Sequence, residues 1–162
     1  MRCRPSLDEL GLSSYRSLPS RLTAGWIASR VRRRVARRKF AFAREVAGYN
    51  VQEGVGQEPI NAVYYYHDGD QYRPHCDGEC HGGRYTLGAR VASSLAYCLT
   101  AERGGYTLFT RAGIKVVPRR RQMLFFGYFY NGSTNVGAVM DNGHTEHTGC
   151  PTHEGRKWIA TM

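Results

Sequence analysis

The stretch INAVYYYHDGDQYRPHCD, residues 60–77, decides the expected fold because the hydrophobic pattern changes there from helical to strand-like. Segments of the same short, β-branched or aromatic type follow it, separated by Gly, Pro or Asn: RVASSLAYCL (90–99), YTLF (106–109), IKVV (114–117), QMLFFGYFY (122–130) and RKWIATM (156–162). No helical pattern lies between these segments. The strands are therefore expected to pair mostly antiparallel.

The first third of the chain carries helical signals instead. Ser6 and Glu9 have the spacing of a capping box before a short apolar segment. Ser20 can cap a longer helix, in which Ile27, Val31 and Val35 recur every four residues and give an apolar stripe. Many short strands after N-terminal helices predict a mainly β fold with a double-stranded β-helix core, a jelly roll of two sheets.

The size of the chain predicts one domain. Its 162 residues are enough to bury a core without disulfides, and 41% hydrophobic and 12% aromatic residues are typical of a globular protein. We expect residues 1–50 to form a helical segment that packs on a core of residues 51–162. The chain is also consistent with truncation at both ends of a longer protein. Residues 1–17 contain no apolar segment, so no signal peptide is predicted, and no apolar run is long enough to span a bilayer.

The net charge of +10 comes almost entirely from arginine. Lysine occurs only at Lys39, Lys115 and Lys157, while RVRRRVARRK fills residues 30–39. Such a run could bind nucleic acid or an acidic partner through phosphate or carboxylate contacts. We favour a solvated helix face, because charge runs usually mean no more than this.

Five cysteines, Cys3, Cys76, Cys80, Cys98 and Cys150, are too few and too scattered for a disulfide framework. The odd count leaves at least one unpaired within the chain. Cys76 with Cys80, or Cys98 with Cys150, could pair in an oxidising compartment, and the sequence leaves this open.

The stretch PHCDGECH, residues 74–81, concentrates metal-ligand side chains and allows two interpretations. His75, Cys76, Cys80 and His81 could close a tetrahedral zinc site. Alternatively, His75 and Asp77 supply two ligands of an iron site, completed by a distant histidine. Side chains alternate between the two faces of a strand, so His75 and Asp77 are expected to point one way and Cys76 the other. That alternation favours iron.

The third iron ligand is expected from NGHTEHTGCPTHEGRKW, which offers His144, His147 and His153. Lys157 stands ten residues after His147, in the last predicted strand. A buried lysine is unfavourable without a partner, so a bound dicarboxylate cosubstrate would explain its place. Taken alone, Lys157 would be read as a charged residue that protects a sheet edge.

These motifs resemble the prolyl 4-hydroxylases, which are iron(II)- and 2-oxoglutarate-dependent dioxygenases. YHDGDQYRPHCD, RVASSLAYC, GGYTLF, VVPRRRQMLFF and HTGCPTHEGRKW follow one another in the order of that family, over residues 60–162. The resemblance implies that His75, Asp77 and His147 bind iron. It implies that Lys157 pairs with the distal carboxylate of 2-oxoglutarate. The sequence departs from the family where YCLT replaces its usual YLN.

The resemblance also implies further site residues. Tyr66, nine positions before His75, is expected in the cosubstrate pocket together with Thr107 of the GGYT turn. Arg90 stands where the family has an arginine near the substrate groove, and a salt bridge at the strand end is an equal alternative. Tyr97 is assigned to substrate binding because tyrosines are frequent in the strand region, and aromatic grooves bind extended proline-rich peptides.

The implied activity is that of an oxidoreductase: hydroxylation of peptidyl-proline, coupled to conversion of 2-oxoglutarate to succinate and carbon dioxide. The implied cofactors are iron(II), 2-oxoglutarate, oxygen and L-ascorbate, and the implied partner is a proline-rich peptide or protein. Two alternatives stay open. One is an oxygenase acting on nucleic acid, with the arginine helix binding phosphates. The other is a zinc-binding, catalytically inactive interaction module built on HCDGECH.

Overall fold

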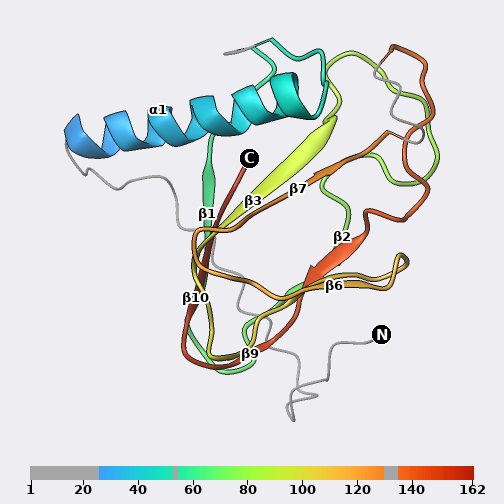
Figure 1. Ribbon diagram of the computed structural model, residues 1–162. Coiled ribbons are helices and arrows are strands. Elements are labelled where there is room, and N and C mark those ends of the chain that lie inside the picture. Colours follow the sequence, from blue (N-terminus) through green and yellow to red (C-terminus); the bar gives the residue numbers. More distant parts are fainter. Residues whose placement is uncertain (1–25, 53–54, 130–134) are drawn as a thin grey trace.

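The computed structural model describes residues 26–52, 55–129 and 135–162, and this part of the chain is mainly β (Figure 1). One four-stranded sheet has the order β1 (Asn61–Tyr65), β10 (Lys157–Thr161), β3 (Ala92–Leu99) and β7 (Met123–Gly127). A second has the order β2 (Tyr72–His75), β8 (His147–Gly149), β5 (Thr107–Phe109) and β6 (Ile114–Val116). A ribbon pairs β4 (Arg103–Gly104) with β9 (Thr152–Glu154).

The pairings within these sheets are all antiparallel, which confirms the sequence expectation. The core lies between the two large sheets. Its buried residues come from alternate positions of three strands of the first sheet: Val63, Tyr65, Leu95, Tyr97 and Ile159. Tyr72 and Val116 of the second sheet pack against them. Two facing antiparallel sheets around one core make the predicted jelly roll, because each sheet buries one face and leaves the other outside.

Within residues 26–52, 55–129 and 135–162 there is one α-helix, α1 (Trp26–Ala41), which crosses the end of the first sheet near the C-terminus (Figure 1). It continues into one π-helical turn, Phe42–Val46. Its buried positions include Ala36, Lys39 and Phe40. The Lys39 ammonium donates to the carbonyl oxygens of Ser94, at 3.1 Å, and Ala160, at 2.8 Å, and so ties the helix to β3 and β10. Burial lowers the pKa of Lys39 to about 8, although the nearby Cys98 acts in the opposite direction.

One of the two predicted helices is described by the structure, whereas the Ser20 cap and the side chains of Ile27 and Val31 lie outside the described residues. The longer helix forms, and the arginines at 32, 33, 34, 37 and 38 are exposed, as expected of a solvated face. The capping box at Ser6 and Glu9 lies outside the described residues, and the division at residue 50 remains a prediction. Among the described helices, none combines the length and the apolar composition that a membrane crossing needs.

Candidate metal and cosubstrate site

Two imidazoles meet on neighbouring strands of the second sheet. His75 is the last residue of β2 and His147 the first of β8, and the register places them directly opposite each other. Opposed residues of an antiparallel pair have close side chains, and the two ring centroids are 4.4 Å apart. The strand pairing therefore creates half of the candidate site without any loop rearrangement.

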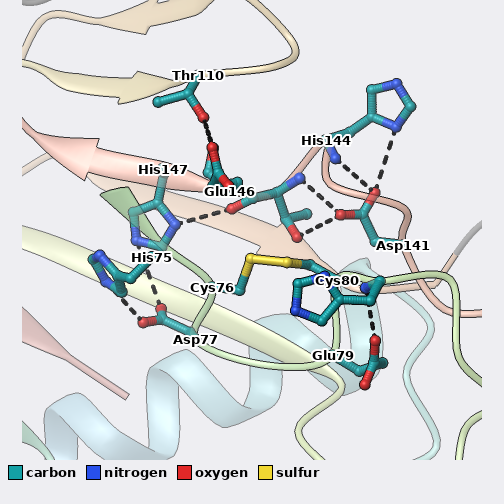
Figure 2. The surroundings of a disulfide bond; sticks show 12 residues. His75, Cys76, Asp77, Glu79, Cys80, Thr110, Asp141, His144, Glu146 and His147 are labelled. Atoms are coloured by element: carbon teal, nitrogen blue, oxygen red, sulfur yellow. Dashed lines mark hydrogen bonds and ion pairs between the residues drawn. A yellow bond between two sulfur atoms is a disulfide. The ribbon is translucent and has the colours of Figure 1, made fainter. Parts of the chain in front are cut away.

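Asp77 brings a carboxylate to these imidazoles from just beyond the end of β2 (Figure 2). Its Oδ1 lies 3.3 Å from Nε2 of His75 and its Oδ2 lies 3.8 Å from Nε2 of His147. The candidate ligand atoms of the three residues all lie within 4.8 Å of one another. Two histidines and one carboxylate grouped on one side of an open cavity are the ligand set of non-haem iron(II) oxygenases.

Backbone carbonyls orient both rings toward the carboxylate. Nδ1 of His75 lies 2.7 Å from the carbonyl oxygen of Arg73, and Nδ1 of His147 lies 3.0 Å from that of Thr145. A carbonyl oxygen only accepts hydrogen bonds, so in each neutral ring Nδ1 is the donor and Nε2 keeps its lone pair. The lone pairs therefore face Asp77, which is the tautomer that metal binding requires.

The charges of the triad also suit a cation. Burial alone would raise the pKa of the Asp77 carboxyl. Hydrogen bonding from His75 and the charge of His147, both of which require a proton on Nε2, act with the Ser93 hydroxyl to lower it to about 2. Burial lowers the pKa of His147, although the charge of Asp77 acts against this. At neutral pH the carboxylate is therefore ionised and the His147 imidazole is neutral, as both must be to bind a metal.

A cavity of about 170 Å³ opens in front of the triad and extends to Lys157. Lys157 begins β10 on the opposite sheet, is only 1% exposed, and has no hydrogen-bond partner for Nζ among the described residues. Burial lowers its pKa to about 7. A buried, unpartnered ammonium that lines the same cavity as the triad fits a ligand with a carboxylate at its far end. The structure thus gives Lys157 a place consistent with its predicted role.

Tyr65, rather than the predicted Tyr66, faces this cavity. Tyr66 is 47% exposed and stacks on Tyr64 on the outer face of the sheet, whereas Tyr65 is buried and lines the cavity. Tyr65 is opposite Lys157 in the register, and Nζ of Lys157 lies 4.4 Å from the centre of its ring. A Cβ at Gly149 would lie 2.6 Å from the Tyr65 hydroxyl, so any larger residue there would displace the Tyr65 ring. Strand alternation from Val63 could have identified Tyr65 in the sequence.

Thr107 and Tyr97 are both buried, but only Thr107 lines the cavity. The hydroxyl of Tyr97 lies 2.8 Å from Oγ1 of Thr107, so Tyr97 supports the wall from behind. The structure therefore brings Thr107 to the predicted cosubstrate pocket and does not bring Tyr97 to the cavity surface.

Arg90 lines the cavity and also forms a salt bridge, so both sequence expectations for it are met in part. Its guanidinium pairs with both carboxylate oxygens of Glu58, Nη2 lying 2.7 Å from Oε2. Its Nη1 donates to the carbonyl oxygen of Asp77 at 2.6 Å. Arg90 therefore braces the main chain at a candidate ligand. No sequence signal pointed to Glu58.

The other predicted ligands lie apart from the triad. Cys76 points away from it and forms a disulfide with Cys80 (Figure 2). A disulfide sulfur is no thiolate, so the tetrahedral zinc set of the alternative interpretation is not formed in this state. His144 pairs with Asp141 and His153 with Asp68, which leaves His147 as the histidine that joins His75 and Asp77. Cys98 is a free cysteine.

The Cys76–Cys80 disulfide closes a short ring that contains Asp77, and we expect it to stabilise the fold modestly. Loop-closure entropy for so short a ring predicts a loss of about 2 kcal/mol in the free energy of unfolding when both cysteines are replaced by serine. Urea unfolding of the Cys76→Ser/Cys80→Ser variant measures this loss. Cys98→Ser, which removes a free thiol, is the matched control. An unchanged urea midpoint in the double variant would contradict the expectation.

Sequence comparison finds prolyl 4-hydroxylases among the known proteins, and no family model matches the chain. Probable prolyl 4-hydroxylase 7 of Arabidopsis thaliana is 29% identical over 119 residues, 61% of this chain and 35% of that protein. Prolyl 4-hydroxylase subunit alpha-1 of Rattus norvegicus is 26% identical across 96% of this chain and 27% of that protein. Subunit alpha-2 of Caenorhabditis elegans is 34% identical across 57% of this chain and 17% of that protein. The chain thus spans 35% or less of the length of each.

Structural comparison finds the fold of this chain in solved prolyl hydroxylases. The viral collagen prolyl hydroxylase of Paramecium bursaria chlorella virus 1, solved as a complex with 2-oxoglutarate, superposes with a TM-score of 0.60 at 20% identity. The match covers 91% of this chain and 75% of that one. A prolyl 4-hydroxylase of Pseudomonas putida gives a TM-score of 0.50 at 16% identity, over 91% of this chain and 68% of that one. At these identities the likeness establishes the shared fold.

Proposed function

Because this chain is a distant relative of the prolyl 4-hydroxylases, a family of iron(II)- and 2-oxoglutarate-dependent dioxygenases, we propose that it hydroxylates peptidyl-proline. One observation carries the proposal: His75, Asp77 and His147 converge on a cavity that also contains the unpartnered ammonium of Lys157. The triad accounts for iron(II). The lysine accounts for a cosubstrate with a second carboxylate.

The residues of the chain divide the work between binding and positioning. Lys157 neutralises the distal carboxylate of 2-oxoglutarate, with Tyr65 and Thr107 as the adjoining walls. Arg90 holds the main chain of Asp77 at the cavity wall. When bound, iron(II) supplies the activation of oxygen, so that one oxygen atom enters the C–H bond and the other enters succinate as carbon dioxide leaves. L-ascorbate is proposed as the reductant that keeps the iron divalent.

Anaerobic titration of 2-oxoglutarate into iron(II)-loaded protein tests the site directly. A weak visible charge-transfer band should appear for the wild-type chain and be absent from His147→Ala. Succinate formation should then rise when a proline-rich peptide is added. Succinate formation stimulated by alkylated DNA or RNA, and not by peptide, would instead support the nucleic-acid alternative. No band, together with tightly held zinc, would overturn the proposal.

The affinity for 2-oxoglutarate should fall as pH rises above neutrality. The pKa of Lys157 is about 7 in the empty cavity, and a bound carboxylate favours the ammonium form. Above pH 7 binding must therefore take up a proton, and the affinity should decline by up to about tenfold per pH unit. Below pH 7 it should level off.

Calorimetric titration between pH 6.5 and 9, in two buffers of different ionisation enthalpy, measures both the affinity and the proton uptake. Lys157→Arg is the matched variant, because arginine stays charged throughout this range and should remove the pH dependence. Equal affinity of the wild type at pH 7 and pH 9, without proton uptake, would show that cosubstrate binding does not protonate Lys157 and would contradict this prediction.

A further inference from the structure

Two buried hydroxyls form a directed chain behind the Asp77 carboxylate. Oγ of Ser93 donates to Oδ2 of Asp77 at 2.8 Å, and the hydroxyl of Tyr128 lies 2.5 Å from the same Oγ. Serine has a single hydroxyl proton, and an ionised carboxylate can only accept. The Ser93 hydroxyl therefore donates its one hydrogen bond to Asp77, and the Tyr128 hydroxyl must donate to Oγ of Ser93. Each donor strengthens the next, so the carboxylate is held in one orientation.

The ring of Tyr128 also fixes the main chain next to Asp77. Tyr128 is fully buried, and its ring lies against Gly78, where a Cβ would meet the ring carbons at 2.9 and 3.0 Å. Gly78 directly follows Asp77, so the backbone beyond the carboxylate cannot shift toward β7 without moving Tyr128. Hydroxyl and ring thus act on Asp77 from two sides.

The backbone of Tyr128 reaches a second candidate ligand through a separate route. Its carbonyl oxygen accepts from the N–H of Asp141 at 2.6 Å. The Asp141 carboxylate then accepts from the backbone N–H of Thr145 at 2.9 Å and from its hydroxyl at 2.8 Å. The carbonyl oxygen of Thr145 is the one that orients Nδ1 of His147. Tyr128 is therefore connected by hydrogen bonds to both Asp77 and His147, through its hydroxyl to the first and through its carbonyl oxygen to the second.

We propose that Tyr128 is a positioning residue that sets the relative placement of Asp77 and His147, acting on Asp77 through Ser93. The inference rests on the proposed metal site. Tyr128 does not line the cavity and would contact neither metal nor substrate. Its part is to pre-arrange the ligands before the metal arrives, because outer partners of metal ligands govern metal affinity as well as ligand orientation.

Tyr128→Phe tests the proposal, because it removes only the hydroxyl. We expect about a 10- to 100-fold rise in the Kd for Fe²⁺ or Mn²⁺, measured by anaerobic calorimetry. Ser93→Ala should cause a similar loss, and the double variant should be no worse than Ser93→Ala alone, since the two hydroxyls act in series. Ser93→Thr keeps a hydroxyl and should restore most of the affinity.

Tyr49→Phe is the matched control. Tyr49 packs on Phe125 and Phe129 near the same strand but is not part of the Asp77 hydrogen-bond chain, so its removal should leave metal affinity unchanged. The visible spectrum of cobalt(II)-loaded protein gives a second readout, and Tyr128→Phe should change it where Tyr49→Phe does not. If the wild type binds metal and Tyr128→Phe binds it equally well, the positioning role is wrong. If the wild type binds no metal, the proposed site itself fails.

Discussion

Replacing Lys157 by methionine should greatly weaken 2-oxoglutarate binding and, at the same time, stabilise the ligand-free protein. The two effects have one origin, the ammonium that is buried without a hydrogen-bond partner among the described residues. With ligand present, that charge binds the distal carboxylate. Losing a buried charged hydrogen-bond partner should raise the Kd by about 100-fold or more. Without ligand, burial of the same charge lowers the free energy of unfolding.

The size of this destabilisation follows from the pKa of Lys157, which falls from 10.5 to about 7 on folding. The difference of 3.5 pKa units corresponds to roughly 4 kcal/mol at neutral pH, as an upper limit. Because the unfolded chain binds more protons between pH 7 and 10.5, wild-type stability should rise with pH across that window. Lys157→Met should lack the larger part of this rise and keep only the part that Lys39, with its pKa of about 8, contributes. It should be roughly 2–4 kcal/mol more stable at pH 7.

Urea unfolding at pH 7 and pH 10, with and without 2-oxoglutarate, measures all of these effects. Lys115→Met is the matched control, because Lys115 is an exposed lysine of β6 that lies over the ring of Tyr106. It should change neither cosubstrate affinity nor the pH dependence of stability. A Lys157→Met protein that binds 2-oxoglutarate as tightly as the wild type would refute the assignment of Lys157.

Replacing Asp77 by asparagine should remove iron(II) binding while leaving a folded protein. Asparagine keeps the size of the side chain but removes the one negative charge of the triad. Since disturbing an outer partner already costs 10- to 100-fold in affinity, loss of the ligand itself should exceed about 100-fold. Calorimetry with Fe²⁺ under anaerobic conditions measures this.

The substitution should also lower stability in a pH-dependent manner. The pKa of Asp77 is about 2 in the folded state, below its ordinary value of 3.8, so the ionised carboxylate stabilises the fold above pH 4. That contribution, about 2 kcal/mol, should be lost in the wild type as pH falls toward 2 and be absent from Asp77→Asn. Asp68→Asn, at an exposed carboxylate paired with His153, is the control. Zinc retained in Asp77→Asn but lost in Cys80→Ala would instead support the zinc-binding module.

Much of the fold was predictable because strand periodicity is a local property. The segments around β1, β3, β5, β6, β7 and β10 match the predicted runs to within a few residues. Buried side chains alternate along β1 and along the first half of β10, whereas β5 is buried throughout. The same alternation could have separated Tyr65 from Tyr66. The position of Tyr66 was instead taken from a family motif, whose spacing does not record which face of β1 is buried.

The supporting residues were not predictable, because their roles depend on distant parts of the chain. Tyr128 meets Ser93 across 35 positions, and Arg90 meets Glu58 across 32. Each looks like an ordinary strand or loop residue in sequence. Lys39 also differed from expectation: it belongs to the basic run, yet its ammonium is buried against two backbone carbonyls. The triad residues can be identified in the sequence by their residue type and spacing. The residues that hold them in place can be identified only from their contacts in the folded structure.

Because His75 and His147 are directly opposite each other in the sheet, metal binding depends on the correct pairing of β2 with β8. A slip of one residue between β2 and β8 would turn one imidazole to the far side of the sheet and destroy the site. A divalent ion therefore binds only chains with the correct register, and binding stabilises those chains alone. Refolding with metal present should accordingly increase the fraction of molecules in which β2 and β8 pair in the correct register. The ion needed for the proposed reaction would then also favour correct folding of its own site.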